Sequence, residues 1–186
     1  MIPRPRGGSQ PRGPSERAYW KHMRALLQRV LRADITVDGV VTGAIGPGLL
    51  VFLGVGREDT ERDVSYLVDK ILHLRIFSDE KGKMNRNLRE TSNAILVASQ
   101  FTLYGSTGKG RRPSFDLAAP PDLARRLYEC FLEQARSAGV ELHCGVFQAH
   151  MCVSLVNDGP VTILLDSLEA TKEKLDKSNL KIDSNN

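Results

Sequence analysis

Short apolar runs separated by turn signals follow the first two dozen residues and restrict this part of the chain to β-structure. The runs are rich in β-branched residues and leucine, which favour strands. Asp38-Gly39 predicts a tight hairpin, and Gly46-Pro47-Gly48 predicts a second turn. Together these signals predict an antiparallel meander. The apolar runs are Ala25–Val30, Ile35–Val37, Val40–Ile45 and Leu49–Val55.

Two later segments have helical spacing instead. One begins at Asp59 or Thr60 and ends near Leu74; the other runs from Pro120 to about Ala138, before a glycine. Further strands are expected at residues 75–77, 94–98 and 140–146. The sequence therefore predicts an α+β class, a curved, mostly antiparallel, barrel-like sheet with two main helices on one side. The expected inner helix faces are Val64, Leu67, Val68, Ile71 and Leu72, then Leu123, Leu127, Cys130, Phe131 and Gln134 or Ala135.

The basic excess of the chain lies in its two ends. Of the formal charge of +4, residues 1–22 hold five basic and one acidic side chain, and residues 171–186 hold four and three. The part between them has 17 basic and 18 acidic residues, so it is not a general polyanion binder by charge count. We expect a disordered basic extension over 1–22, a folded domain over 23–170 and a flexible tail over 171–186.

Several classes of protein are disfavoured by composition. No apolar run approaches the ~20 residues of a membrane span, and no secretory signal is visible. The three cysteines form no C-x-x-C pair and the four histidines no H-x-x-x-H pair, so neither a metal site nor a cofactor is expected. We interpret the cysteines as buried thiols and expect a cytoplasmic protein.

The stretch from His150 to Asp166 contains two strand-like runs, Met151–Val156 and Val161–Leu165, around Asn-Asp-Gly-Pro. Pro160 lacks an N–H, and a Gly-Pro bond can adopt the cis form, so two neighbouring carbonyls could point the same way. Such a pair could accept hydrogen bonds from an ammonium group. An ordinary hairpin turn is the alternative interpretation.

A second polar stretch, Ser-Gln-Phe-Thr-Leu-Tyr, follows the predicted buried strand at 94–98. Ser99 and Thr102 could act as nucleophiles, but a hydroxyl nucleophile needs a base within hydrogen-bond reach. No histidine is close in sequence, although His73, His143 or His150 could approach in the fold. We therefore predict no catalytic triad.

Two basic features have competing interpretations. Residues 105–115 form a glycine-rich loop with Lys109, Arg111 and Arg112, which lacks the spacing of a phosphate-binding P-loop. It is either a solvated loop or a contact for a nucleic-acid backbone. Arg29, in the first predicted strand, either points outward or reaches into a site.

The two polar stretches, SQFTLY at 99–104 and NDGPVT at 157–162, resemble the signature motifs of the D-aminoacyl-tRNA deacylase family. The resemblance continues in QRV at 28–30, RPSF at 112–115 and LD at 165–166, and it spans about residues 23–168. One departure is Gln148, where the family usually has glycine in a Phe-Gly-Ala sequence. The added side chain would narrow or reshape the entrance to the site.

The resemblance implies a homodimer with active sites at the subunit interface, each hydrolysing the ester of a D-aminoacyl-tRNA. In the family the Gly-Pro bond is cis and enters the partner's site, where it excludes L side chains sterically while glycine is not excluded. Backbone N–H groups of Phe101 and Thr102 would hold the oxyanion, with the 2′-OH of the terminal ribose activating water. The residues suggested on this basis are Ser99, Gln100, Phe101 and Thr102 for catalysis, and Gly159, Pro160, Arg29, Met151 and Asn157 for substrate. Our own candidates for contacts with the tRNA backbone are Lys109, Arg111 and Arg112.

Three alternatives stay open at this point. Thr102 could be a covalent nucleophile. The chain could be a non-enzymatic nucleic-acid-binding protein that uses its basic tails. It could also be a related deacylase with altered amino-acid specificity, since fold alone does not decide function.

Overall fold

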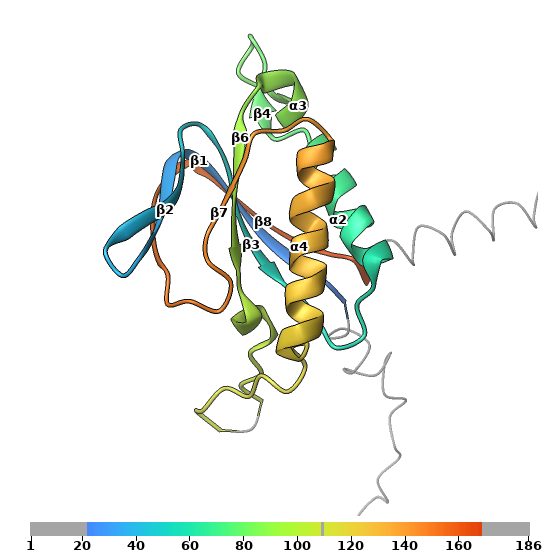
Figure 1. Ribbon diagram of the computed structural model, residues 1–186. Helices are drawn as coiled ribbons and strands as arrows, with labels where there is room; N and C mark the ends of the chain where they lie inside the picture. Colours follow the sequence, from blue (N-terminus) through green and yellow to red (C-terminus); the bar gives the residue numbers. More distant parts are fainter. Residues whose placement is uncertain (1–21, 109, 169–186) are drawn as a thin grey trace, which may run out of the picture.

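The computed structural model describes residues 22–108 and 110–168. The predictions for Lys109, residues 1–21 and the C-terminal tail lie outside these residues. The predicted α+β class with two main helices is confirmed (Figure 1). The elements are β1 (Arg24–Val37), β2 (Val40–Ile45), β3 (Gly48–Gly54), α2 (Glu61–His73), β4 (Phe77–Ser78), β5 (Met84–Arg86), α3 (Leu88–Thr91), β6 (Ala94–Ser99), η1 (Phe101–Tyr104), α4 (Pro121–Ser137), β7 (Leu142–Cys144) and β8 (Cys152–Asp166).

Strand β1 is the centre of the sheet, and the predicted meander is wrong in its order. The hairpin at Asp38-Gly39 forms as expected, with both residues at positive φ. However, β3 pairs with the first half of β1 and β2 pairs with its second half, both antiparallel. The chain therefore does not reverse at Gly46-Pro47. A single 14-residue β1 offers one edge long enough for both strands, which the short apolar runs did not reveal.

Strand β8 covers the other edge of β1, and the hairpin interpretation of residues 157–160 is wrong. Both of its runs pair with β1 in succession, with Asn157 opposite Val30 and Thr162 opposite Gln28. Residues 158–161 have no partner in that register and form a bulge. The two apolar runs thus belong to one 15-residue strand interrupted by a bulge.

The remaining strands are parallel, β3 with β6 and β6 with β7. Parallel neighbours need long crossover connections. Helix α2 lies in the connection from β3 to β6, and α4 lies in that from β6 to β7. Both helices pack side by side on one face of the curved sheet (Figure 1). None of the helices in the described part of the chain is long and apolar enough to cross a membrane.

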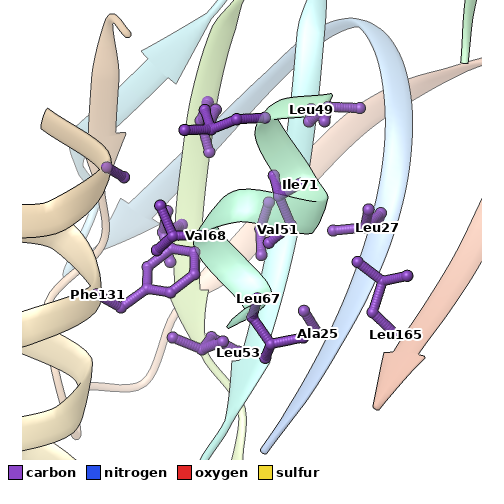
Figure 2. Packing of buried hydrophobic residues seen from close by; sticks show 14 of the residues in the cluster. Ala25, Leu27, Leu49, Val51, Leu53, Leu67, Val68, Ile71, Phe131 and Leu165 are labelled. Carbon is purple, nitrogen blue, oxygen red and sulfur yellow. The ribbon is translucent and has the colours of Figure 1, made fainter. Parts of the chain in front are cut away.

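The main core lies between that sheet face and the two helices (Figure 2). The five predicted apolar residues of the first helix are all buried. In α4 the prediction was partly right, because Leu127, Phe131 and Ala135 are buried but so are Tyr128 and Leu132. Tyr128 fits the core because its O–H donates to the Val97 carbonyl at 3.1 Å.

The opposite sheet face is less completely covered. Leu26 of β1 is paired with Phe52 of β3 on one side and with Leu164 of β8 on the other. Because directly paired residues of neighbouring strands point to the same face of a sheet, these three side chains form a row on this face. Leu164 is 57% exposed. Cys152 is also exposed, so the expectation that all three cysteines are buried is wrong; they are free, and Cys152 begins the edge strand β8.

Candidate active site

The SQFTLY stretch forms the end of the buried strand β6 and the turn that follows it. Ser99 pairs with Leu53 of β3, and the N–H of Gln100 donates to the Leu53 carbonyl at 2.8 Å. Pairing with the parallel neighbour then stops. The chain tightens into η1, which places polar side chains at the end of a rigid strand.

The first two N–H groups of η1 have no acceptor within the turn. Its first bond runs from the N–H of Leu103 to the carbonyl of Gln100, at 3.4 Å. Since a 3-10 helix bonds each N–H to the carbonyl three residues back, Phe101 and Thr102 are left without one. Both residues are exposed. Two adjacent backbone donors without an acceptor in the turn therefore belong to exposed residues.

A buried tyrosine and a buried arginine hold this turn in place. Tyr104 is fully buried, and its O–H lies 2.7 Å from the carbonyl of His22 and 3.3 Å from that of Gly54. Burial raises the pKa of the Tyr104 phenol, so it stays a donor. Arg24 donates to the Leu103 carbonyl at 2.9 Å, and its guanidinium lies over the Tyr104 ring. The turn is thus anchored from behind.

Among the described residues, only Gln100 hydrogen-bonds to the Thr102 hydroxyl, and it does so as a donor through Nε2. Within the described residues, no imidazole hydrogen-bonds to this hydroxyl. His73 and His143 each contact an acidic residue near them in sequence. His150 lines the same cavity as Gln100, but the structure gives it no hydrogen bond to Thr102.

A cavity of about 670 Å³ opens beside this turn. Its lining includes Ser99, Gln100 and Phe101 and the segment 147–151. Phe101 and Phe115 meet edge to face, with ring centroids 5.0 Å apart. The walls are thus largely aromatic and apolar, with polar groups at the strand end, as is usual for a ligand pocket.

Some of these residues were missed from the sequence. Tyr128 and Phe147 line the cavity, with ring centroids 5.5 Å apart, and His150 lines it too. The sequence did contain signals for two of the aromatic residues. Phe147 belongs to the Phe-Gln-Ala segment at 147–149, where the family usually has Phe-Gly-Ala, and Phe115 belongs to the RPSF segment at 112–115. Helical spacing alone could not have distinguished Tyr128 from other core residues.

The Gly159-Pro160 element lies apart from this cavity within one chain. Its peptide bond is cis, and Gly159 has φ +112°. The buried side chain of Arg29 lies next to Gly159. Its Nε forms an ion pair with a carboxylate oxygen of Asp158 at 2.8 Å, but the angles of this contact do not meet those of a hydrogen bond. Arg29 Nη1 also donates to the carbonyl of Ile76. Both Gly159 and Pro160 are exposed.

The structure therefore divides the predicted site residues into two groups. Ser99, Gln100, Phe101 and Met151 share the cavity, with Thr102 next to them. Arg29, Gly159 and Pro160 form the second group, beside Asn157, whose buried Oδ1 has no described hydrogen-bond partner. The predicted tRNA contacts belong to neither group: Arg111 and Arg112 are exposed on the loop closed by the Ser106–Ser114 bridge, and Lys109 lies outside the described residues.

A buried acid lies behind the turn. Asp59 is 5% exposed, and its Oδ2 accepts a hydrogen bond from the Gly56 N–H at 2.6 Å. Burial, together with the nearby charges of Asp63 and Asp166, raises the pKa of Asp59 to about 8. Within the described residues, no group of three or more His, Cys, Asp or Glu side chains is arranged to hold a metal.

Comparison with known proteins gives a consistent result. Residues 26–166 match the family described as D-Tyr-tRNA(Tyr) deacylase. The D-aminoacyl-tRNA deacylase of Heliobacterium modesticaldum is 56% identical over 144 residues, which are 77% of this chain and 96% of the relative. That of Koribacter versatilis is 57% identical over 145 residues, 78% of this chain and 97% of the relative.

Solved structures share the fold. The structure of a c-Myc DNA Unwinding Element Binding Protein has a TM-score of 0.72 and 44% identity, over 76% of this chain and 97% of that chain. The structure of "a probable eukaryotic D-amino acid tRNA deacylase" has a TM-score of 0.69 at 22% identity, over 78% of this chain and 99% of that chain.

Proposed function

The chain belongs to the D-Tyr-tRNA(Tyr) deacylase family, and we propose that it hydrolyses the ester of D-aminoacyl-tRNA, and of glycyl-tRNA, in the cytoplasm. Water adds to the ester carbonyl carbon, the bond to the ribose oxygen breaks, and free amino acid and tRNA leave. The observation that carries the proposal is the exposed turn at Phe101 and Thr102, which presents two backbone donors beside a cavity.

The two donors provide the rate enhancement in this proposal. The tetrahedral intermediate carries a negative oxygen, and a preorganised donor typically lowers such a barrier by about 3–4 kcal/mol. The anchoring of η1 by Tyr104 and Arg24 supports this role, since a donor must not move during the reaction. Gln100 positions the substrate, and the ribose 2′-OH activates water.

The cavity would hold the terminal nucleoside of the tRNA. With the ester at η1, the attached adenosine must occupy the adjoining space, and aromatic side chains such as Phe101, Phe115 and Phe147 suit a planar base. Met151 contributes to the same wall. A cavity of about 670 Å³ lies in the usual range for sites of this kind.

Chirality would be selected across a homodimer. The carbonyls of Gly159 and Pro160 of one chain would accept the substrate ammonium in the partner's site, which leaves room for a D side chain but not an L side chain. Two features support this: both residues are exposed in a bulge without register partners, and they do not line the cavity of their own chain. The row of Leu26, Phe52 and Leu164 supplies an apolar face for the second subunit.

The test is hydrolysis of matched D-tyrosyl-, L-tyrosyl- and glycyl-tRNA by the full-length protein. We expect rapid loss of the D and glycyl esters and persistence of the L ester. Hydrolysis of the L ester would favour a deacylase of altered specificity. No hydrolysis by a folded protein that still binds tRNA would favour the non-enzymatic, tail-driven alternative.

A further inference from the structure

We propose that Arg125 is a binding residue for the phosphate that joins the terminal nucleoside of the tRNA to the nucleotide before it. This inference rests on the proposed function and adds a specific contact to it. Arg125 lies in α4, and nothing in the sequence motifs points to it.

Two residues of the cavity wall hold the Arg125 side chain in one orientation. Its guanidinium carbon lies 4.6 Å from the centroid of the Phe147 ring, a cation–π contact. Its Nη2 donates to Oε1 of Gln148 at 3.2 Å. Both contact residues line the cavity, so the guanidinium lies at the rim.

The backbone at Gln148 has a conformation that is unfavourable for a residue with a side chain. Gln148 has φ +66°, a left-handed conformation that residues with a side chain adopt rarely. Residues in such conformations cluster at functional sites, where the surrounding structure maintains them. In this conformation the Gln148 amide oxygen accepts the hydrogen bond from Arg125.

The charge of Arg125 is not neutralised by any described residue. Its neighbour along α4 differs in this respect: Arg126 lies 2.8 Å from a carboxylate oxygen of Glu61. Arg24 and Arg29 likewise contact aspartates. Arg125 is exposed and contacts only a neutral amide and an aromatic ring among the described residues. A fixed, unneutralised guanidinium with free N–H groups is the preferred partner of a phosphate.

The position of Arg125 matches the path of the substrate. If the ester lies at η1 and the terminal nucleoside fills the cavity, the chain of the tRNA must leave through the rim. The first group outside the cavity is then the phosphate on the 5′ side of that nucleoside. Arg125 lies at the rim beside Phe147 and Gln148, where this phosphate would pass.

The test uses binding of a short single-stranded RNA with a free 3′ adenosine, measured by fluorescence anisotropy with the full-length protein. A second RNA has a neutral methylphosphonate at the last linkage. We expect Arg125→Ala to weaken binding of the natural RNA about tenfold and to leave binding of the methylphosphonate RNA unchanged. Arg126→Ala, the matched control, should bind both RNAs as the wild type does. Gln148→Gly, which retains the φ but removes the acceptor, should weaken only the natural RNA.

Equal weakening of both RNAs by Arg125→Ala, or no weakening of either, would overturn the proposal, as would a wild type that binds the two RNAs equally. Binding of these RNAs involves no ester. The phosphate contact can therefore fail while D-aminoacyl-tRNA hydrolysis stands, and hydrolysis can fail while the contact stands.

Discussion

A Cβ atom placed on Gly159 would lie 2.8 Å from Nη2 of Arg29. Arg29 cannot easily withdraw, because it is buried and donates to the carbonyl of Ile76. The φ of +112° at Gly159 is also unfavourable for any other residue. We therefore expect Gly159→Ala to displace the bulge and to lower kcat/KM for D-tyrosyl-tRNA by about 10²-fold, since a shift of ~1 Å in a site can cost that much.

Gly139→Ala is the matched control for this variant. Gly139 has φ +80°, but its Cβ position is open and it follows α4, away from the cavity. This change should cost about 1 kcal/mol of stability and leave deacylation unchanged. Equal activity of Gly159→Ala and wild type would contradict the role of the bulge.

Thr102→Val distinguishes the two chemical roles proposed for this hydroxyl. Removal of a covalent nucleophile lowers kcat by about 10⁴-fold or more. Thr102 accepts from Gln100 and has no basic partner among the described residues, so we expect a change of less than about tenfold. Single-turnover hydrolysis of D-tyrosyl-tRNA measures it. A loss of the larger size would reinstate Thr102 as the nucleophile.

Leu164→Asp tests the apolar sheet face. If this row packs against a second subunit, a buried carboxylate there is strongly unfavourable, and we expect the protein to sediment as a monomer and to lose deacylation. Met84→Asp is the control, because Met84 has nearly the same exposure, 56% against 57%, but lies on the separate two-stranded sheet. A dimeric Leu164→Asp, or a monomeric but active one, would contradict the shared site.

The raised pKa of Asp59 leads us to expect that the free energy of unfolding decreases as the pH rises. Its pKa is about 8 in the folded protein and near 3.8 when exposed, so the folded state binds the proton more tightly. Protonation of Asp59 therefore stabilises the folded state fully below about pH 4, and this stabilisation is lost as the pH rises to about 8. The free energy of unfolding changes by on the order of a few kcal/mol over this range.

Asp59→Asn removes this titration and keeps an acceptor for the Gly56 N–H. Urea unfolding at several pH values should show the variant gaining stability relative to wild type from pH 5 to 8 and no further above that. Parallel curves for the two proteins would mean that burial and the carboxylates of Asp63 and Asp166 do not raise the pKa of Asp59 in this way.

Local signals were sufficient for most of the elements. The Asp38-Gly39 hairpin and the apolar stripe of α2 were predicted correctly, because each depends on residues within a few positions of one another. The two signature stretches, at residues 99–104 and 157–162, were also sufficient to identify the family. The spacing of apolar residues and the signature stretches can both be found without knowing how the chain folds.

The pairing of distant segments could not be predicted in this way. That β2, β3 and both halves of β8 all pair with β1 depends on competition between strand edges, which no local pattern encodes. For the same reason, a supposed hairpin at Asn157–Pro160 proved to be a bulge, and Arg125 met Gln148 across 23 positions. The sequence by itself determined the class, the helices and the motif residues. The tertiary structure alone decided which of those residues share the cavity, because burial and hydrogen bonding there are made between elements that are far apart in the chain.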